Sequence, residues 1–157
     1  DLKNAADKKI FLALAQTADV LVESYAPGTT KKLGIDYATL NALNPRLIYC
    51  SITGYGQDGP YAQAAGYDFA IQAESGLMAI TGEPDGSPMK HGVAITDIVT
   101  GMNATQAILA ALLAREKTGQ GQLIDVSLFD SAVALLANNA GRLIDNTCKS
   151  FSYICLL

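Results

Sequence analysis

Asp97 is the residue whose surroundings in this sequence most favour chemistry. It is the only charged residue between His91 and Arg115, and apolar residues flank it on both sides. Burying an ionised carboxylate is costly unless hydrogen bonds or dipoles compensate. An aspartate that opens a helix commonly caps it, and the helix terminus then holds the carboxylate ionised in a dry site. Such a carboxylate can also attack an activated acyl group, so Asp97 is interpreted as a helix cap, a nucleophile or both.

A polar pair, Tyr67 and Asp68, follows a glycine-rich loop at residues 54–66. In one interpretation Tyr67 lies at the edge of the core and Asp68 caps a helix; in the other they form one wall of a ligand site. The loop contains neither G-x-x-x-x-G-K-[ST] nor G-x-G-x-x-G, so it only weakly indicates a phosphate cradle. Lys31 and Lys32 could meet a phosphate as point charges, or be a solvated surface doublet.

Other kinds of catalytic site have less support. His91 has neither a nucleophile nor an orienting acid beside it, so it is expected to be structural or at the surface. Ser51, Ser127 and Ser131 lack a G-x-S-x-G elbow. Cys50 lies in an apolar run, where a thiol is usually an inert small hydrophobe. The three cysteines and one histidine show no zinc-ligand spacing, so no metal site is expected.

The elements that position these residues alternate between helix and strand. Periodicity and turn residues predict helices at 5–17, 29–34, 36–43, 67–79, 97–117 and 128–144, strands at 19–24, 46–52 and 123–127, and a short extended stretch at 92–96. This order indicates an α/β fold with a Rossmann-like parallel sheet flanked by helices. Loops that leave the carboxyl ends of such strands form the ligand crevice, which favours residues 54–66 as part of a site. The helix at 97–117 is apolar nearly all round and is expected to be central and buried.

The composition excludes several classes of protein. The 157 residues are 50% apolar and 17% charged, so the chain is not intrinsically disordered. A net charge of −4 without a basic block argues against a nucleic-acid partner. Uninterrupted apolar runs fall short of the roughly 18 residues of a membrane span. Sparse cysteines fit a reducing cytoplasm. Residues 1–4 carry no targeting signal and read like the interior of a longer protein, so a fragment is expected.

Five segments together resemble the family III CoA-transferases, the group that includes formyl-CoA transferase and the alpha-methylacyl-CoA racemases. They run in the order of that family and cover residues 1–145. The matching phrases are ADVLVESYAPGTTKKLGIDY (18–37), NPRLIYCSITGYGQDGP (44–60), GYDFAIQAESGLMAITGEPDGSP (66–88), GVAITDIVTGM (92–102) and AALLAREKTGQGQLIDVSLFDSAVALL (110–136).

The resemblance implies a mechanism and a set of site residues. Asp97 matches the nucleophile of the family, which attacks an acyl-CoA thioester and passes through an aspartyl-CoA thioester before an incoming carboxylic acid takes the CoA. Ser24 stands where transferases often have asparagine. The positions that match CoA contacts of the family are Ser24, Tyr25, Lys32, Leu33, Tyr67 and Asp68.

Tyr67 distinguishes the two branches of this superfamily. The racemases are similar around residues 66–68 but have a histidine at the position of Tyr67. Racemisation moves a proton from one face of a carbon to the other and needs two groups, and a phenol is a poor base at neutral pH. A transferase is therefore favoured. The alternatives are an acyl-CoA racemase or epimerase acting by alpha-proton transfer, and a truncated, non-catalytic fragment that binds CoA.

The resemblance also implies the organisation of the parent enzyme. Residues 1–145 correspond to part of the large domain of a cytoplasmic, interlocked homodimer. Its substrates are an acyl-CoA and a small carboxylic acid, with no tightly bound cofactor and no membrane partner. Residues 146–157 do not resemble the family and are expected to be a divergent tail without assigned structure. The leading strand and the small domain of the family are absent from this chain, so the chain alone is expected to be inactive.

Overall fold

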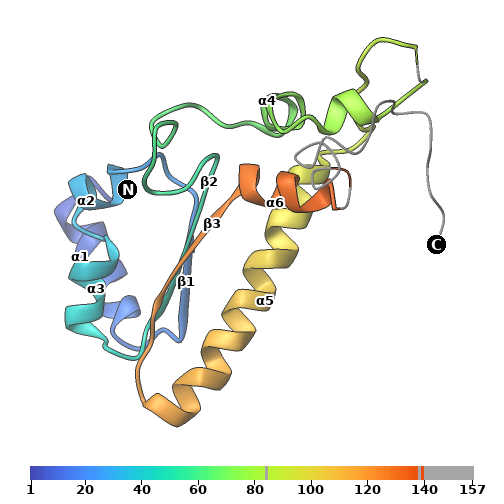
Figure 1. Cartoon of the computed structure of the whole chain (residues 1–157). Helices are drawn as coiled ribbons and strands as arrows, with labels where there is room; N and C mark the ends of the chain where they lie inside the picture. Colours follow the sequence, from blue (N-terminus) through green and yellow to red (C-terminus); the bar gives the residue numbers. More distant parts are fainter. Residues whose placement is uncertain (84, 138, 140–157) are drawn as a thin grey trace.

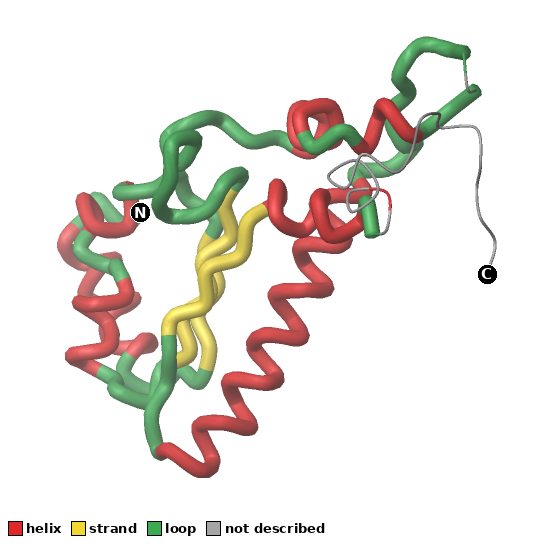
Figure 2. The backbone as a smooth tube through the Cα atoms, in the orientation of Figure 1, coloured by secondary structure: helices red, strands yellow, loops and turns green. Residues whose placement is uncertain are grey.

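A three-stranded parallel sheet forms the centre of the structure, a computed structural model that describes residues 1–83, 85–137 and 139 (Figures 1 and 2). The strands β1 (Val20–Glu23), β2 (Ile48–Thr53) and β3 (Leu123–Ser127) lie in the order β1-β2-β3. β2 is buried along nearly its whole length, as expected for a central parallel strand. The predicted α/β fold with a parallel sheet flanked by helices is confirmed.

Helices lie on both faces of this sheet (Figure 1). On one side are α1 (Ala5–Ala15), α2 (Thr29–Leu33) and α3 (Tyr37–Leu43), and on the other are α5 (Ile95–Thr118) and α6 (Leu128–Leu135). The helix α4 (Asp68–Glu74) and the 3-10 turn η1 (Leu77–Ile80) lie near the N-terminal end of α5. The first core cluster joins α1 and α3 to β2 through Ala15, Ile35, Leu40, Leu47 and Tyr49. The second joins α4 to α6 through Ile71, Leu128 and Ala132.

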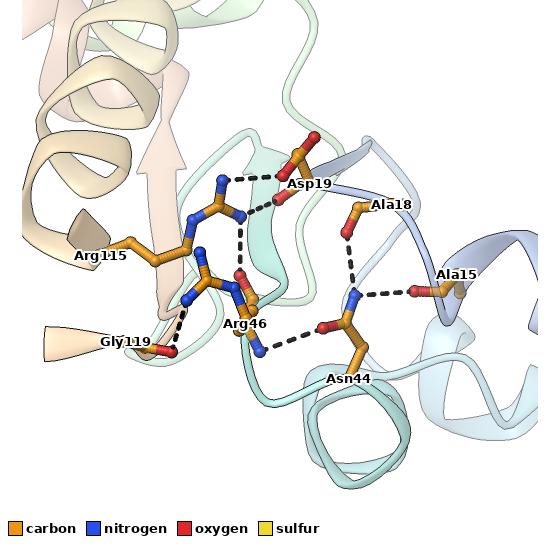
Figure 3. Close-up of polar contacts among 7 residues, drawn as sticks. All are labelled: Ala15, Ala18, Asp19, Asn44, Arg46, Arg115 and Gly119. Carbon is orange, nitrogen blue, oxygen red and sulfur yellow. Dashed lines mark hydrogen bonds and ion pairs between the residues drawn. The ribbon is translucent and has the colours of Figure 1, made fainter.

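Arg115 and Asn44 form hydrogen bonds with the turns that precede the strands, at the amino-terminal end of the sheet (Figure 3). The guanidinium of Arg115, which is 6% exposed, donates to the backbone oxygens of Arg46 at 3.0 Å and Asp19 at 3.3 Å, and to Asp19 Oδ1 at 2.8 Å. Asn44 Nδ2 donates to the backbone oxygens of Ala15 and Ala18. These bonds satisfy carbonyls at chain turns and fix the C-terminal end of α5 against the sheet.

Three predicted element boundaries were wrong. The helix expected at 67–79 divides at Gly76, whose φ of +84° is the left-handed conformation that ends α4 before η1. The stretch expected to be extended at 92–96 already includes the first residues of α5, which begins at Ile95. The last helix ends at Leu135, and the tail at 146–157 lies outside the described residues.

The prediction that the long apolar helix is buried all round was also wrong. α5 packs against the sheet and against α4 and α6, and its buried residues form a stripe at mostly four-residue spacing, while large apolar side chains on its other faces are exposed. By length and composition alone α5 could cross a bilayer, but core helices of soluble proteins share these properties. The buried stripe consists of Thr96, Thr100, Ala104, Ala111 and Arg115, and the exposed apolar residues are Ile98, Met102, Leu109 and Leu113.

We expect the isolated 157-residue chain to associate in solution, because the open face of α5 is apolar. Leu109 and Leu113 are 56% and 71% exposed, and contiguous apolar surface of this kind favours contact with other chains. Size-exclusion chromatography with light scattering should give a mass above 16.5 kDa. The double variant Leu109→Glu, Leu113→Glu should shift the chain toward monomer, whereas Lys117→Glu should not. A monodisperse wild-type monomer would contradict this expectation.

Candidate active site at the N-terminus of α5

Asp97 lies in the first turn of α5, but it does not cap the helix as predicted. The N-cap residue is Ala94, which has no side chain that could accept a hydrogen bond, and Asp97 is three residues further along. The cap comes from α4 instead. Asp68 Oδ1 accepts hydrogen bonds from Thr96 N at 2.8 Å, from Thr96 Oγ at 2.6 Å and from Asp97 N at 3.4 Å. Asp68 therefore satisfies the amides that open α5, and the carboxylate of Asp97 is left available for chemistry.

Gln72 holds Asp68 in this orientation. Its Nε2 donates to Asp68 Oδ2 at 2.6 Å, and its Oε1 accepts from the backbone amide of His91 at 2.9 Å. The side chain is 1% exposed, so these bonds form in a protected environment. Sequence reasoning missed Gln72 and Thr96; the available signal was a glutamine on the apolar face of a predicted helix, four residues after an aspartate.

The two carboxylates have opposite shifts of pKa. Partial burial raises the pKa of Asp68, but hydrogen bonds from the side chains of Thr96 and Gln72 and from the amides of Thr96 and Asp97 outweigh it, so the pKa is lowered. The pKa of Asp97 is raised, first by desolvation and second by the negative charge of Asp68. Asp68 thus stays ionised as a fixed acceptor, while Asp97 is the more basic and more nucleophilic carboxylate.

Asp97 and the nearby N-cap residue of α4, Tyr67, face solvent in the described structure rather than a dry interior. Asp97 belongs to the exposed residues, and Tyr67, the N-cap residue of α4, is 77% exposed. The expectation of a carboxylate in a dry site was therefore wrong for the residues described. An ionised, accessible carboxylate in the first turn of a helix can attack an electrophile that approaches from solvent, and this is chemistry that the arrangement permits.

The other predicted contact residues form a second group at the carboxyl end of β1. Ser24 and Tyr25 directly follow the strand, and both line a cavity of about 480 Å³ together with Glu23 and Ile52. This volume is typical of a pocket for part of a small-molecule ligand. Lys32 is exposed and Leu33 is half-buried in the short helix α2, which follows the same loop.

The glycine-rich loop runs from β2 to α4, between the two groups (Figure 1). Its two ends meet: a Cβ added at Gly54 would lie 2.6 Å from the Cα of Gly66, so the close approach requires glycine. Thr53 Oγ accepts a hydrogen bond from Gly56 N at 2.9 Å and fixes the first turn. No hydrogen bond or ion pair among the described residues joins Asp97 to the group around Ser24.

His91 and Cys50 have structural rather than catalytic surroundings within the described part of the chain. His91 contacts Gln72 through its backbone amide and meets no nucleophile there. Cys50 is fully buried; burial, together with the negative charges of Glu23 and Asp125, raises the pKa of its thiol and makes it unreactive. The described residues contain no group of three or more His, Cys, Asp or Glu side chains that could hold a metal ion.

A comparison with known families identifies the family of this chain. The sequence profile described as CoA-transferase family III matches residues 1–147. The chain belongs to this family. It is similar to the succinate–glutarate CoA-transferase of Agrobacterium fabrum (52% identity over 138 residues) and to the human succinyl-CoA:glutarate CoA-transferase (46% over 142 residues). These alignments cover 88% and 90% of the chain.

Solved structures of similar proteins have the same architecture as this chain. A CAIB/BAIF family protein from Brucella suis superimposes with a TM-score of 0.91 at 47% identity, over 94% of this chain and 39% of that one. The curated relatives are also longer, since the chain spans 34% of the Agrobacterium enzyme and 32% of the human one. The resemblance seen in the sequence is confirmed at the level of family and fold.

Proposed function

We propose that residues 1–145 are part of the large domain of a CoA-transferase that moves coenzyme A from an acyl-CoA to a small carboxylic acid. Family membership and the transferase relatives support the reaction class. The observation that carries the proposal is the cap that Asp68 of α4 supplies to α5. Asp68 accepts hydrogen bonds from the first amides of α5, and the carboxylate of Asp97, which has a raised pKa, takes no part in the cap.

In the proposed reaction Asp97 is the nucleophile. One carboxylate oxygen attacks the thioester carbon, the C–S bond breaks, and CoA leaves as a thiolate while a mixed anhydride forms. The thiolate then attacks the aspartyl carbonyl and releases the donor acid as a carboxylate. The enzyme is left as an aspartyl-CoA thioester, so the energy of the thioester bond is conserved and no water is consumed.

The second half of the reaction reverses these steps with a different acid. The acceptor carboxylate attacks the aspartyl thioester, and the CoA thiolate leaves to give a new mixed anhydride. Attack of the thiolate on the acceptor acyl carbon forms the product thioester and regenerates the Asp97 carboxylate. Water must be kept from the anhydrides, so the exposed site described above has to be covered during turnover.

The remaining predicted residues are proposed to bind the CoA moiety. CoA is a long molecule, and a binding mode from Ser24, Tyr25, Lys32 and Leu33 across the glycine loop to Tyr67, Asp68 and Asp97 would join the two separate groups. The cavity beside Ser24 and Tyr25 supports this path. We further propose that the complete enzyme is a cytoplasmic interlocked homodimer that needs no tightly bound cofactor.

The acceptor is proposed to be a small dicarboxylic acid. The printed names of the similar enzymes include succinate, glutarate and, for an Acetobacter aceti enzyme at 46% identity, oxalate. All three are short chains with two carboxylates.

A transfer assay with an exchange control tests this function. The full-length enzyme is incubated with succinyl-CoA and glutarate, and glutaryl-CoA is measured by liquid chromatography. In parallel, incorporation of deuterium at the alpha carbon of the acyl-CoA is measured in heavy water. We expect transfer without alpha exchange. Exchange without transfer would instead identify the racemase alternative, and neither activity would favour a CoA-binding role.

A further inference from the structure

A row of polar side chains crosses the three strands at the level where β1 ends. The register pairs Glu23 of β1 with Ser51 of β2, and Ser51 with Asp125 of β3. Residues paired in adjacent strands project to the same face of a sheet, so these three side chains lie side by side. Glu23 and Ser51 are 9% and 2% exposed. A carboxylate and a hydroxyl in such a position need specific partners.

Glu23 finds its partners on both sides. One carboxylate oxygen accepts a hydrogen bond from the hydroxyl of Ser51, and the other accepts from the backbone amide of Tyr25 at 2.8 Å. The second bond closes a turn over Ser24. The conformation of the loop that leaves β1 is therefore set by a carboxylate that is itself fixed by β2.

Ser51 also forms a hydrogen bond with the glycine-rich loop. Its Oγ accepts a hydrogen bond from Gln57 Nε2 at 2.6 Å, while the backbone amide of Gln57 donates to Asp125 Oδ2 at 2.9 Å. Gln57 is an exposed residue of the glycine loop, and these two bonds fasten it to the sheet. One hydroxyl thus links Glu23 to Gln57, because it donates to the first and accepts from the second.

We propose that Ser51 is a positioning residue that couples the loop after β1, which carries Ser24 and Tyr25, to the glycine loop through Gln57. This inference rests on the proposed function, in which these loops hold the acyl-CoA. Loops fixed in one geometry before the ligand arrives lose less conformational freedom on binding. Through Ser51, the conformation of one loop is linked to that of the other.

Steady-state kinetics of the full-length enzyme test the proposal. Ser51→Ala should raise KM for the acyl-CoA about tenfold with kcat within about twofold, because ground-state binding is affected more than the chemistry. Ser131→Ala is the matched control: this serine is 3% exposed and hydrogen-bonded to Ser127 O and Asn103, but its side chain forms no hydrogen bond with either loop. It should leave both constants within about twofold of wild type.

Gln57→Ala provides a second variant that leaves the core intact, since this side chain is at the surface. It removes the same link from the other end and should raise KM as Ser51→Ala does. If either folded variant has the KM of the Ser131→Ala control, the coupling is wrong. An inactive wild-type enzyme would instead count against the proposed function.

Amide hydrogen exchange measures the link without turnover. In Ser51→Ala the backbone amide of Gln57 should exchange faster than in wild type even without ligand, because the side chain of Gln57 no longer has its hydrogen bond to Ser51. Added CoA should slow exchange at Tyr25 in both proteins, but at Gln57 only in wild type. Equal exchange at Gln57 in the two proteins, with and without CoA, would overturn the proposal.

Discussion

Asp97→Asn should abolish CoA transfer in the full-length enzyme, with kcat reduced at least about a thousandfold. An amide keeps the size of the side chain, but it cannot attack a thioester as a carboxylate does. Asp97→Ala should be equally inactive. Both variants should fold, because Asp97 contributes only its backbone amide to the cap at α5. Turnover of succinyl-CoA and glutarate, together with a thermal unfolding curve, measures the two properties separately.

Asp130→Asn is the matched control for this loss. Asp130 occupies the same position in the first turn of α6 that Asp97 occupies in α5, three residues after the N-cap residue Ser127. Its side chain accepts from Ser127 Oγ at 2.7 Å, which asparagine can also do. The control should retain most of the activity. If Asp97→Asn retained wild-type turnover, a covalent role for this carboxylate would be excluded.

Asp68→Asn should both weaken transfer and change its pH dependence. The neutral side chain no longer repels the negative charge on Asp97, so the pKa of Asp97 falls although its burial is unchanged. The ionised nucleophile then persists to lower pH, and the acid limb of kcat/KM moves to lower pH. At neutral pH we expect about a tenfold loss, because the introduced amide group would face the donor Gln72 Nε2 and disturb the cap.

The pH profile of kcat/KM distinguishes this effect from general damage to the site. Glu74→Gln removes one negative charge from the same helix, but Glu74 contacts Tyr55 rather than α5. Its acid limb should coincide with that of wild type. An acid limb that stays in place or moves to higher pH in Asp68→Asn would contradict the electrostatic coupling between the two aspartates.

The sequence predicted the elements of the sheet, because they depend on local patterns, and it indicated a candidate nucleophile whose role stays a prediction. Short β-branched runs between helical segments indicated the parallel strands, and the isolation of Asp97 among apolar residues marked it as the candidate nucleophile. The left-handed break at Gly76 was missed, because a glycine within a helical pattern is often tolerated.

Contacts between distant segments could not be predicted in the same way. Asp68 caps α5 across 28 residues of sequence, and no local pattern reveals a cap supplied by another helix. The burial of α5 was misjudged for a related reason. The large apolar side chains indicated a helix buried all round, but the buried stripe of the helix consists of small and polar residues such as Thr100 and Ala104.

Trapping of the covalent intermediate tests the central claim, that Asp97 carries CoA during transfer. The full-length enzyme is incubated with acyl-CoA in the absence of acceptor, treated with hydroxylamine or borohydride, and digested for peptide mass mapping. The modification should lie between Gly92 and Arg115 and map to Asp97, and it should be absent from Asp97→Asn. A label on Cys50 instead, or no label while the enzyme turns over, would contradict the mechanism.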